Sequence, residues 1–212
     1  MHNIHSKEIE NYCEEHSTQT SDLLKKVARQ SFLRTNHGIM ISGPIQGAFI
    51  AQLVALKPEA KVLEIGTFTG YTTIAIAEAL GENGQVTTIE IDPEHHYIAE
   101  EFIDEHEGKG KINLILGDAK EVLQELEEDW DIVLVDAAKM DNAYYYNLLM
   151  PRLKSGALFL LDNVLWKGKI LEEKMDKRTA EIDRFNRELA ADERVQVTLL
   201  PIRDGLTMIR KK

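Results

Sequence analysis

Residues 61–72 constrain the fold more strongly than any other stretch of this sequence, and they read K-V-L-E-I-G-T-F-T-G-Y-T. Residues 62–65 are mostly apolar, as in a buried parallel strand, and Gly66 and Gly70 interrupt the pattern before a helix-like segment begins at Tyr71. A glycine turn between a strand and a helix lets a ligand lie close to the main chain. The stretch therefore predicts an α/β fold with a nucleoside site at this turn.

The spacing of the glycines narrows the kind of ligand. Glu64 precedes Gly66-x-x-x-Gly70, and neither the dinucleotide pattern G-x-G-x-x-G nor the phosphate loop G-x-x-x-x-G-K-[ST] is present. A turn without a third glycine or a phosphate-binding lysine suits an uncharged or cationic ligand better than a pyrophosphate. A second acid, Glu90, ends the next apolar segment, residues 86–89. The pattern is similar to the S-adenosylmethionine site of class I methyltransferases, and the alternative is a plain strand–helix turn that binds no ligand.

Composition and charge limit the class of protein. A chain of 212 residues with 43% hydrophobic and 29% charged residues predicts one globular domain. The net charge of -11 argues against a general nucleic-acid binder, although it is compatible with a local basic patch. The single cysteine, Cys13, permits no intrachain disulfide, and the first residues lack the apolar core of a signal peptide. No apolar run approaches the ~20 residues that span a bilayer, so we expect a cytoplasmic protein with no membrane partner.

Strand-like and helix-like patterns alternate from residue 61 onward, which is typical of a mostly parallel sheet with helices on both faces. The predicted strands cover residues 62–65, 85–90, 112–116, 131–136 and 157–161. The predicted helices between them cover residues 71–80, 93–106, 119–126 and 144–153. A final helix, residues 175–191, precedes two alternating segments, residues 196–200 and 206–210. The Asp204-Gly205 pair between these two segments predicts a hairpin, and hence an antiparallel pair at a sheet edge.

The N-terminal segment is predicted to be helical. Two helix-like stretches, residues 6–16 and 20–30, precede the sheet, and Pro44 is suited to the first turn of a helix that runs to Leu56. Met40 lies on the intervening loop. Most methionines fill cores, and the alternative for Met40 is a lid over the ligand.

Three polar side chains follow the fourth and fifth predicted strands, namely Asp136, Asp162 and Asn163. Ligands of open parallel sheets bind at the carboxyl ends of the strands, so we expect these side chains to converge with the glycine turn. Two carboxylates and an amide oxygen suit Mg²⁺, Mn²⁺ or Ca²⁺, whereas the lack of a Cys/His cluster argues against zinc. The alternative for each residue is a strand-end cap or turn residue.

Lys139 lies three residues after Asp136 and is predicted to reach the same site. Beside a divalent cation the charged form of a lysine is disfavoured, which favours a role as general base. The alternative is a solvated loop lysine. Trp166 is predicted to be either a pocket wall or a core residue, and Tyr144-Tyr145-Tyr146 is predicted to be packing surface.

These motifs together resemble the cation-dependent O-methyltransferases that include the caffeoyl-CoA and catechol enzymes. The matching motifs are Glu64-Ile65-Gly66-Thr67, Gly70-Tyr71-Thr72, Glu90, Gly117-Asp118-Ala119, Asp136-Ala137-Ala138-Lys139, Asp162-Asn163-Val164-Leu165-Trp166 and residues 200–206. The resemblance implies a Rossmann-like class I methyltransferase fold with a seven-stranded, mostly parallel sheet, an antiparallel last strand and helices on both faces. It also implies one domain, 1–212, in which residues 1–56 form N-terminal helices and an acceptor-side lid and residues 57–212 form the cofactor- and metal-binding core.

The resemblance also implies a role for each matching residue. The cofactor S-adenosylmethionine would contact Met40, Ser42, Glu64, Gly66, Thr67, Thr72, Glu90, Asp118, Ala119 and Asp136. A divalent cation, Mg²⁺ or alternatively Mn²⁺ or Ca²⁺, would be held by Asp136, Asp162 and Asn163. Lys139 would be the catalytic base, Trp166 and Lys167 would lie near the substrate, and the protein would be a homodimer.

Two departures from the plant caffeoyl-CoA enzymes concern the methyl acceptor. Ala138 replaces an aspartate beside the metal, and Lys167 replaces an asparagine near the substrate. Both argue against a plant-type acyl-CoA acceptor. The sequence therefore predicts methyl transfer to one hydroxyl of a catechol-like small molecule that chelates the metal.

Two other classes of function stay open. One is a tRNA methyltransferase that acts on a hydroxylated wobble uridine, for which Lys154, Lys167, Lys169 and the tail at residues 210–212 would supply a basic patch. The other is a nicotinamide oxidoreductase or a non-catalytic nucleoside-binding module. The missing third glycine and the metal-ligand set disfavour this last class.

Overall fold

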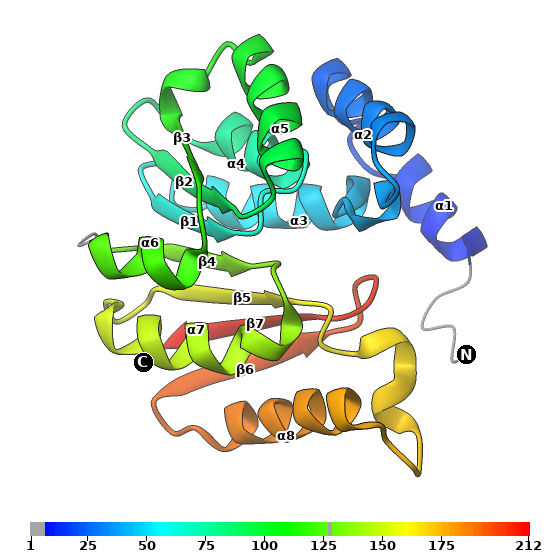
Figure 1. Ribbon diagram of the computed structural model, residues 1–212, viewed down its shortest axis with the longest axis vertical. Coiled ribbons are helices and arrows are strands. Elements are labelled where there is room, and N and C mark those ends of the chain that lie inside the picture. Colours follow the sequence, from blue (N-terminus) through cyan, green and yellow to red (C-terminus); the bar gives the residue numbers. More distant parts are fainter. Residues whose placement is uncertain (1–6, 127–128) are drawn as a thin grey trace. The chain divides into compact units, whose positions relative to one another are not determined.

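The computed structural model describes residues 7–126 and 129–212. The described residues form two compact units, one within Glu8–Glu128 and one within Asp129–Lys212, which we call the N-terminal unit and the C-terminal unit (Figure 1). The predicted single domain of residues 1–212, with a helical segment over residues 1–56 and a core over residues 57–212, stays a prediction. No helix that the described residues form is both long and apolar enough to cross a bilayer.

The N-terminal unit contains three parallel strands, β1 (Lys61–Ile65), β2 (Gln85–Glu90) and β3 (Ile112–Leu116), in the order β3-β2-β1. The residues that follow two of the strands continue the pairing. The Gly66 amide donates to the Ile89 carbonyl at 2.9 Å, and the Gly117 amide donates to the Glu90 carbonyl at 2.8 Å. The ends of β1 and β2 are therefore fixed at the points where ligands of such sheets bind.

The helices of the N-terminal unit confirm most of the predicted segments. They are α1 (Lys7–Glu15), α2 (Asp22–Arg34), α3 (Gly43–Ala55), α4 (Tyr71–Ala79), α5 (Pro93–Glu105) and α6 (Ala119–Glu125), with 3₁₀ turns η1 (Gly38–Met40) and η2 (Lys109–Lys111). The predicted boundaries of α2, residues 20–30, are wrong. The Ser21 hydroxyl accepts a hydrogen bond from the Leu24 amide at 3.2 Å, so it caps a helix that begins at Asp22. The predicted start of the first helix at residue 6 lies outside the described residues.

A hydrophobic core joins α2, α4 and α5 of the N-terminal unit. Its buried members are Leu24, Val27, Ile41, Tyr71, Ile74, Ala75, Ile98, Ala99, Phe102 and Ile103. A buried polar contact lies beside it: the hydroxyls of Ser31 and Thr69 are 2.6 Å apart. Because the Ser31 hydroxyl donates to the Val27 carbonyl at 2.7 Å, its oxygen accepts from Thr69. Helix α2 therefore holds the turn that follows β1.

The C-terminal unit contains four strands, β4 (Ile132–Val135), β5 (Leu158–Asp162), β6 (Val195–Leu200) and β7 (Leu206–Lys211), in the order β4-β5-β7-β6. β4 and β5 are parallel, whereas β7 is antiparallel to both β5 and β6. The predicted hairpin and antiparallel last strand are confirmed. β5 begins and ends one residue later than predicted, so Asp162 is its final residue.

The helical segments of the C-terminal unit are η3 (Lys139–Asp141), α7 (Asn142–Leu149), η4 (Met150–Arg152), η5 (Trp166–Leu171) and α8 (Lys177–Ala191). The predicted helix at residues 144–153 is wrong at both ends. It begins at Asn142, and its last turn is the 3₁₀ turn η4, where Pro151 has no amide proton to continue an α-helix. The Lys211 ammonium donates to the carbonyls of Met150, at 2.9 Å, and of Leu153, which satisfies acceptors at this helix end.

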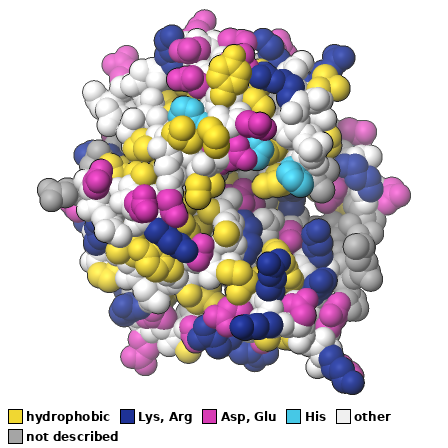
Figure 2. Space-filling model, viewed as in Figure 1, with side chains coloured by type: hydrophobic (Ala, Val, Ile, Leu, Met, Phe, Trp, Pro, Cys, Tyr) yellow, Lys and Arg dark blue, Asp and Glu magenta, His cyan; other side chains and the backbone are white. Residues whose placement is uncertain are grey.

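The tyrosine triplet of α7 is mainly packing surface, as predicted. Tyr145 and Tyr146 are buried and Tyr144 is exposed. The Tyr146 hydroxyl donates to Asp192 at 2.8 Å, and the Asp192 carboxylate also accepts from the Arg194 guanidinium at 2.6 Å and 2.9 Å. Figure 2 shows Lys and Arg side chains gathered where η5 and α8 lie, with Asp and Glu side chains beside them.

Candidate active site

The turn after β1 has a left-handed backbone at three positions. Gly66 and Gly70 have φ angles of 99° and 85°, which side chains with a Cβ rarely adopt. Phe68 between them also has a positive φ, 52°. The edge of its ring meets the ring of His95 at a centroid distance of 4.7 Å. This turn is therefore specified by its two glycines and by contacts that hold Phe68 in a disfavoured conformation.

Glu90, at the end of β2, supplies the main polar contact of this turn. One carboxylate oxygen accepts a hydrogen bond from the Phe68 amide at 2.6 Å, and the other accepts from the Asp92 amide at 2.9 Å. The side chain is 6% exposed. Each carboxylate oxygen can accept a second hydrogen bond. Glu90, a predicted cofactor contact, is thus fixed in place and retains one acceptor site on each oxygen, which suits a pair of hydroxyls.

Glu64, in β1, lies in a buried network of threonine hydroxyls. Its carboxylate accepts from the Thr88 hydroxyl at 2.6 Å and from the Thr73 hydroxyl. Since Thr88 has only one hydroxyl proton, the hydroxyl of Thr67, 2.6 Å away, donates to Thr88. The network links β1, β2 and α4 beneath the glycine turn. Of these threonines, only Thr67 was predicted from the sequence, as a cofactor contact, because the contacts of the group join distant parts of the chain.

Two further predicted cofactor residues meet in the N-terminal unit. The hydroxyls of Ser42 and Thr72 are both buried and lie 2.8 Å apart. Met40 in η1 is 53% exposed, so the interpretation as core filler is wrong. Its role as a lid over the ligand stays a prediction.

Asp118 and Asp92 are helix caps. The Asp118 carboxylate accepts from the Lys120 amide at 2.8 Å at the start of α6, and the Asp92 carboxylate accepts from the Glu94 amide at 2.8 Å at the start of α5. Ala119 is buried in the first turn of α6. The cofactor contacts predicted for Asp118 and Ala119 stay predictions.

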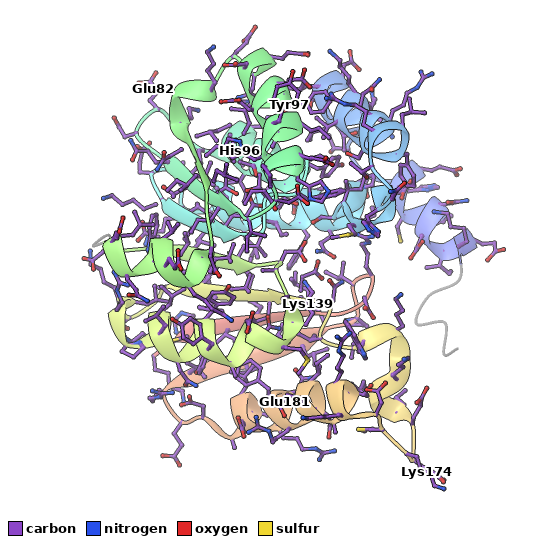
Figure 3. All side chains as sticks on the ribbon, in the orientation of Figure 1. Glu82, His96, Tyr97, Lys139, Lys174 and Glu181 are labelled. Carbon is purple, nitrogen blue, oxygen red and sulfur yellow. The ribbon has the colours of Figure 1, made fainter. Side chains whose placement is uncertain are left out.

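In the C-terminal unit, Lys139 and Asp136 form a close ion pair. The ammonium nitrogen lies 2.6 Å from the Asp136 carboxylate, and the two side chains are 11% and 21% exposed. Lys139 lies on the segment between β4 and α7 (Figure 3). The alternative interpretation of Lys139 as a solvated loop lysine is therefore wrong.

Asp162 is the last residue of β5 in the same unit, and Asn163 follows it. Asp162 is 2% exposed, and its carboxylate accepts from the Asn163 amide at 2.6 Å. Burial raises the pKa of Asp136 to about 6, and the negative charge of Asp162 adds to the rise, whereas Lys139 and Arg203 oppose it. The negative charge of Asp162 thus disfavours the ionised form of Asp136. A cation bound by both would relieve this repulsion.

The donor set fits a hard divalent cation. Within residues 7–126 and 129–212, no three His, Cys, Asp or Glu side chains are grouped as a metal site. The predicted set does not require such a group, because its third member is the amide oxygen of Asn163. Carboxylate and amide oxygens are the ligands that Mg²⁺ and Ca²⁺ prefer. The assignment of Asp136, Asp162 and Asn163 as metal ligands stays a prediction that the chemistry of these residues supports.

The two predicted substrate residues lie in η5 and have left-handed backbones, with φ angles of 49° at Trp166 and 56° at Lys167. Trp166 is half-buried and Lys167 is exposed. The Lys167 amide donates to the Asp204 carboxylate. The pKa of Asp204 is raised, mainly because partial burial desolvates its carboxylate. From the sequence, Asp204 was predicted to be part of a hairpin turn and of the matching motif at residues 200–206, whereas its contact with a residue 37 positions away was not predicted.

Comparison with known proteins places these two clusters in a family context. The family model described as "O-methyltransferase" matches residues 14–212. A probable caffeoyl-CoA O-methyltransferase 2 of Dictyostelium discoideum is 31% identical over 98% of this chain and 93% of its own length. A catechol O-methyltransferase of Niastella koreensis is 33% identical over 74% of this chain and 73% of its own length.

Solved structures confirm the fold. The O-methyltransferase from Bacillus cereus in complex with SAH superimposes with a TM-score of 0.85 and 28% sequence identity, over 97% of each chain. The predicted class, a Rossmann-like fold with a seven-stranded, mostly parallel sheet and an antiparallel last strand, is therefore confirmed. The family match over residues 14–212 thus includes the motifs of both units that resemble those of O-methyltransferases.

Proposed function

Because the chain belongs to the O-methyltransferase family, we propose that it moves a methyl group from S-adenosylmethionine to one hydroxyl of a catechol-like small molecule bound at a divalent cation. The observation that carries this proposal is the largely buried ion pair of Asp136 and Lys139, together with the negative charge of the buried Asp162, which acts on Asp136. A residue that only caps a strand end does not require a second acid and a lysine beside it. Relatives named for caffeoyl-CoA and catechol support a phenolic acceptor.

The N-terminal unit would bind the methyl donor. Glu90 is held by two backbone amides, so its carboxylate is oriented before the nucleoside arrives. Gly66 carries no Cβ, which would let the ligand lie close to the main chain of the turn. Ser42 and Thr72 would offer hydroxyls to the amino-acid end of the donor. The hydrogen bond between Ser31 of α2 and Thr69 would keep this turn rigid.

The C-terminal unit would orient and activate the acceptor. Asp136, Asp162 and Asn163 would hold the cation, and when bound it would lower the pKa of a chelated phenol from near ~10 toward neutrality. Asp162 is the last residue of β5, and Asp136 and Asn163 directly follow β4 and β5, so the strands fix the positions of these residues. Trp166 and Lys167 would border the acceptor.

Lys139 would accept the phenolic proton as a neutral amine, a form that the charge of the bound cation would favour over the ammonium that pairs with Asp136. Its nitrogen is already positioned by the Asp136 carboxylate at 2.6 Å, so little side-chain freedom is lost when it acts. The proton passes to the lysine nitrogen, the phenolic oxygen forms a bond to the methyl carbon, and the bond from that carbon to sulfur breaks. Charge is neutralised in this step. The main contribution of the protein would therefore be positioning, which can be worth ~7–11 kcal/mol.

The tRNA alternative is less well supported by the side chains of the C-terminal unit. Lys154 pairs with Asp129 at 2.8 Å, and Lys169 lies 3.6 Å from Asp176. The Lys211 ammonium is bound to backbone carbonyls. Basic side chains that are already paired have less charge to offer a phosphate backbone. The mixture of acidic and basic side chains in Figure 2 agrees with this.

Two further properties belong to the proposal. We propose that the protein acts in the cytoplasm, where its exposed Cys13 would stay reduced. We also propose that it forms a homodimer. Light scattering at several protein concentrations measures the dimer directly, and a monomer at every concentration contradicts it.

A methyl-transfer screen tests the function. The purified protein is incubated with S-adenosylmethionine and either simple catechols or tRNA that carries hydroxylated uridine, with and without EDTA. We expect a methylated catechol that disappears with EDTA and returns with added Mg²⁺. Full activity after EDTA treatment would remove the metal from the proposal, and methylated tRNA without methylated catechol would favour the alternative.

A further inference from the structure

The segment that follows β5 leaves the strand with an unusual backbone. Asn163, Trp166 and Lys167 have φ angles of 57°, 49° and 56°. These are left-handed conformations, which residues with a Cβ rarely adopt. Asn163 is one of the proposed metal ligands, so something outside this segment must hold the backbone that aims it.

The turn between β6 and β7 provides some of that support. The Asp204 carboxylate accepts from the Lys167 amide, and the Asp204 carbonyl accepts from the Leu165 amide at 2.9 Å. The Gly205 carbonyl accepts from the Val164 amide at 3.3 Å. Three amides along one short segment are therefore bound by two residues of the hairpin turn.

Close packing and a second side chain complete the contact. A Cβ at Gly205 would lie 2.4 Å from Cγ of Leu165, so only glycine permits the approach of the turn. From α8, the Asn186 side-chain amide donates to the Val164 carbonyl at 2.9 Å. The Val164 residue is thus held on both sides, by Gly205 and by Asn186.

We propose that Asp204 and Asn186 are positioning residues. They hold residues 163–167 in the backbone conformation that directs Asn163 and Asp162 to the cation. This inference rests on the proposed metal-dependent function. Neither residue needs to touch the cation. Residues that orient metal ligands through a second layer of contacts commonly change metal affinity 10–100-fold when they are replaced, because the ligands must then be ordered at the moment of binding.

Paired substitutions separate positioning from charge. Asp204→Ala removes the acceptor for the Lys167 amide, whereas Asp204→Asn keeps an oxygen acceptor and removes only the charge. Asn186→Ala removes the donor to the Val164 carbonyl. Asp192→Asn is the matched control, since it removes a hydrogen-bonded carboxylate elsewhere in the same unit. Each protein is titrated with Mn²⁺ by calorimetry without acceptor, and S-adenosylmethionine affinity is measured in parallel.

We expect Mn²⁺ affinity to fall about 10–100-fold in Asp204→Ala, less in Asn186→Ala, and little in Asp204→Asn and in the control. S-adenosylmethionine affinity should stay unchanged in all four. Equal losses in Asp204→Ala and Asp204→Asn would show a charge effect and overturn the positioning role, as would unchanged affinity in Asp204→Ala.

Hydrogen exchange gives a readout that needs no metal. In the metal-free protein, the amides of Val164, Leu165 and Lys167 should exchange faster in Asp204→Ala than in wild type, and wild-type rates there would also overturn the inference. If wild type itself binds no Mn²⁺, the proposed function fails first. Faster exchange in the variant would then identify the contact as support for the backbone alone.

Discussion

Replacing Glu90 by alanine should lower both the affinity for the cofactor and the free energy of unfolding, and the two losses arise from different hydrogen bonds of the carboxylate. In the protein without ligand, the carboxylate already accepts two backbone hydrogen bonds, from Phe68 at 2.6 Å and from Asp92 at 2.9 Å. Hydrogen bonds to a charged group contribute ~1.5–3 kcal/mol, and the Phe68 bond also stabilises a residue with a positive φ of 52°. We expect Glu90→Ala to lower the free energy of unfolding by about 2–4 kcal/mol, less than the sum of two full hydrogen bonds because water can reach the freed amides.

The loss of cofactor affinity has a separate cause. The remaining acceptor sites of the Glu90 carboxylate would bind the ribose hydroxyls, and their loss should cost ~1.5–3 kcal/mol of binding free energy, or about 10–150-fold in Kd. Because these bonds are the same in the ground and transition states, the loss should appear in KM more than in kcat. Calorimetric titration with S-adenosylmethionine and thermal unfolding measure the two effects independently.

Asp92→Ala is the matched control for this experiment. Asp92 lies two residues away and caps α5 through its carboxylate, so its loss should cost ~0.5–2 kcal/mol of stability and leave cofactor affinity unchanged. Unchanged S-adenosylmethionine affinity in Glu90→Ala would refute the cofactor role. An equal loss of affinity in both variants would show that the effect comes from a disordered turn and not from the carboxylate.

Further predictions concern the C-terminal unit. Lys139→Met should lower kcat by ~10²–10⁴, with Mn²⁺ and cofactor affinities little changed. The loss of kcat should be smaller with a nitro-substituted catechol, which ionises more readily, than with plain catechol. Equal losses of kcat for both acceptors across pH would remove the base role. Asp136→Asn and Asp162→Asn should each abolish turnover and metal binding while S-adenosylmethionine still binds, which calorimetry checks. Asp192→Asn should lower stability at neutral pH by ~1.5–3 kcal/mol. The Arg194 guanidinium holds the pKa of Asp192 below its usual value, so this stabilisation is present above about pH 4 and is lost as pH falls through the lowered pKa. Urea unfolding of both proteins should therefore show a gap that narrows in acid, and a constant gap would contradict the ion pair.

The sequence by itself determined the features that depend on neighbours along the chain. Residues 61–72 were predicted as strand, turn and helix because a buried strand and two glycines lie within a few residues of each other. The caps at Asp92 and Asp118 and the β6–β7 hairpin were predictable for the same reason, since the contacts that define them lie within a short segment. The motif spacings were also sufficient to identify the family, which the match over residues 14–212 confirms.

Tertiary structure alone decided how the candidate site is supported. Glu64 accepts from Thr88, Ser31 contacts Thr69, and Asp204 holds Lys167, across separations of 24, 38 and 37 residues. No periodicity or residue spacing in the sequence predicts such contacts, because each side chain is compatible with many partners until the strands and helices have packed. The left-handed backbones at residues 163, 166 and 167 follow the same rule. A conformation that is locally disfavoured forms only where distant groups stabilise it, so it cannot be inferred from the residues that adopt it.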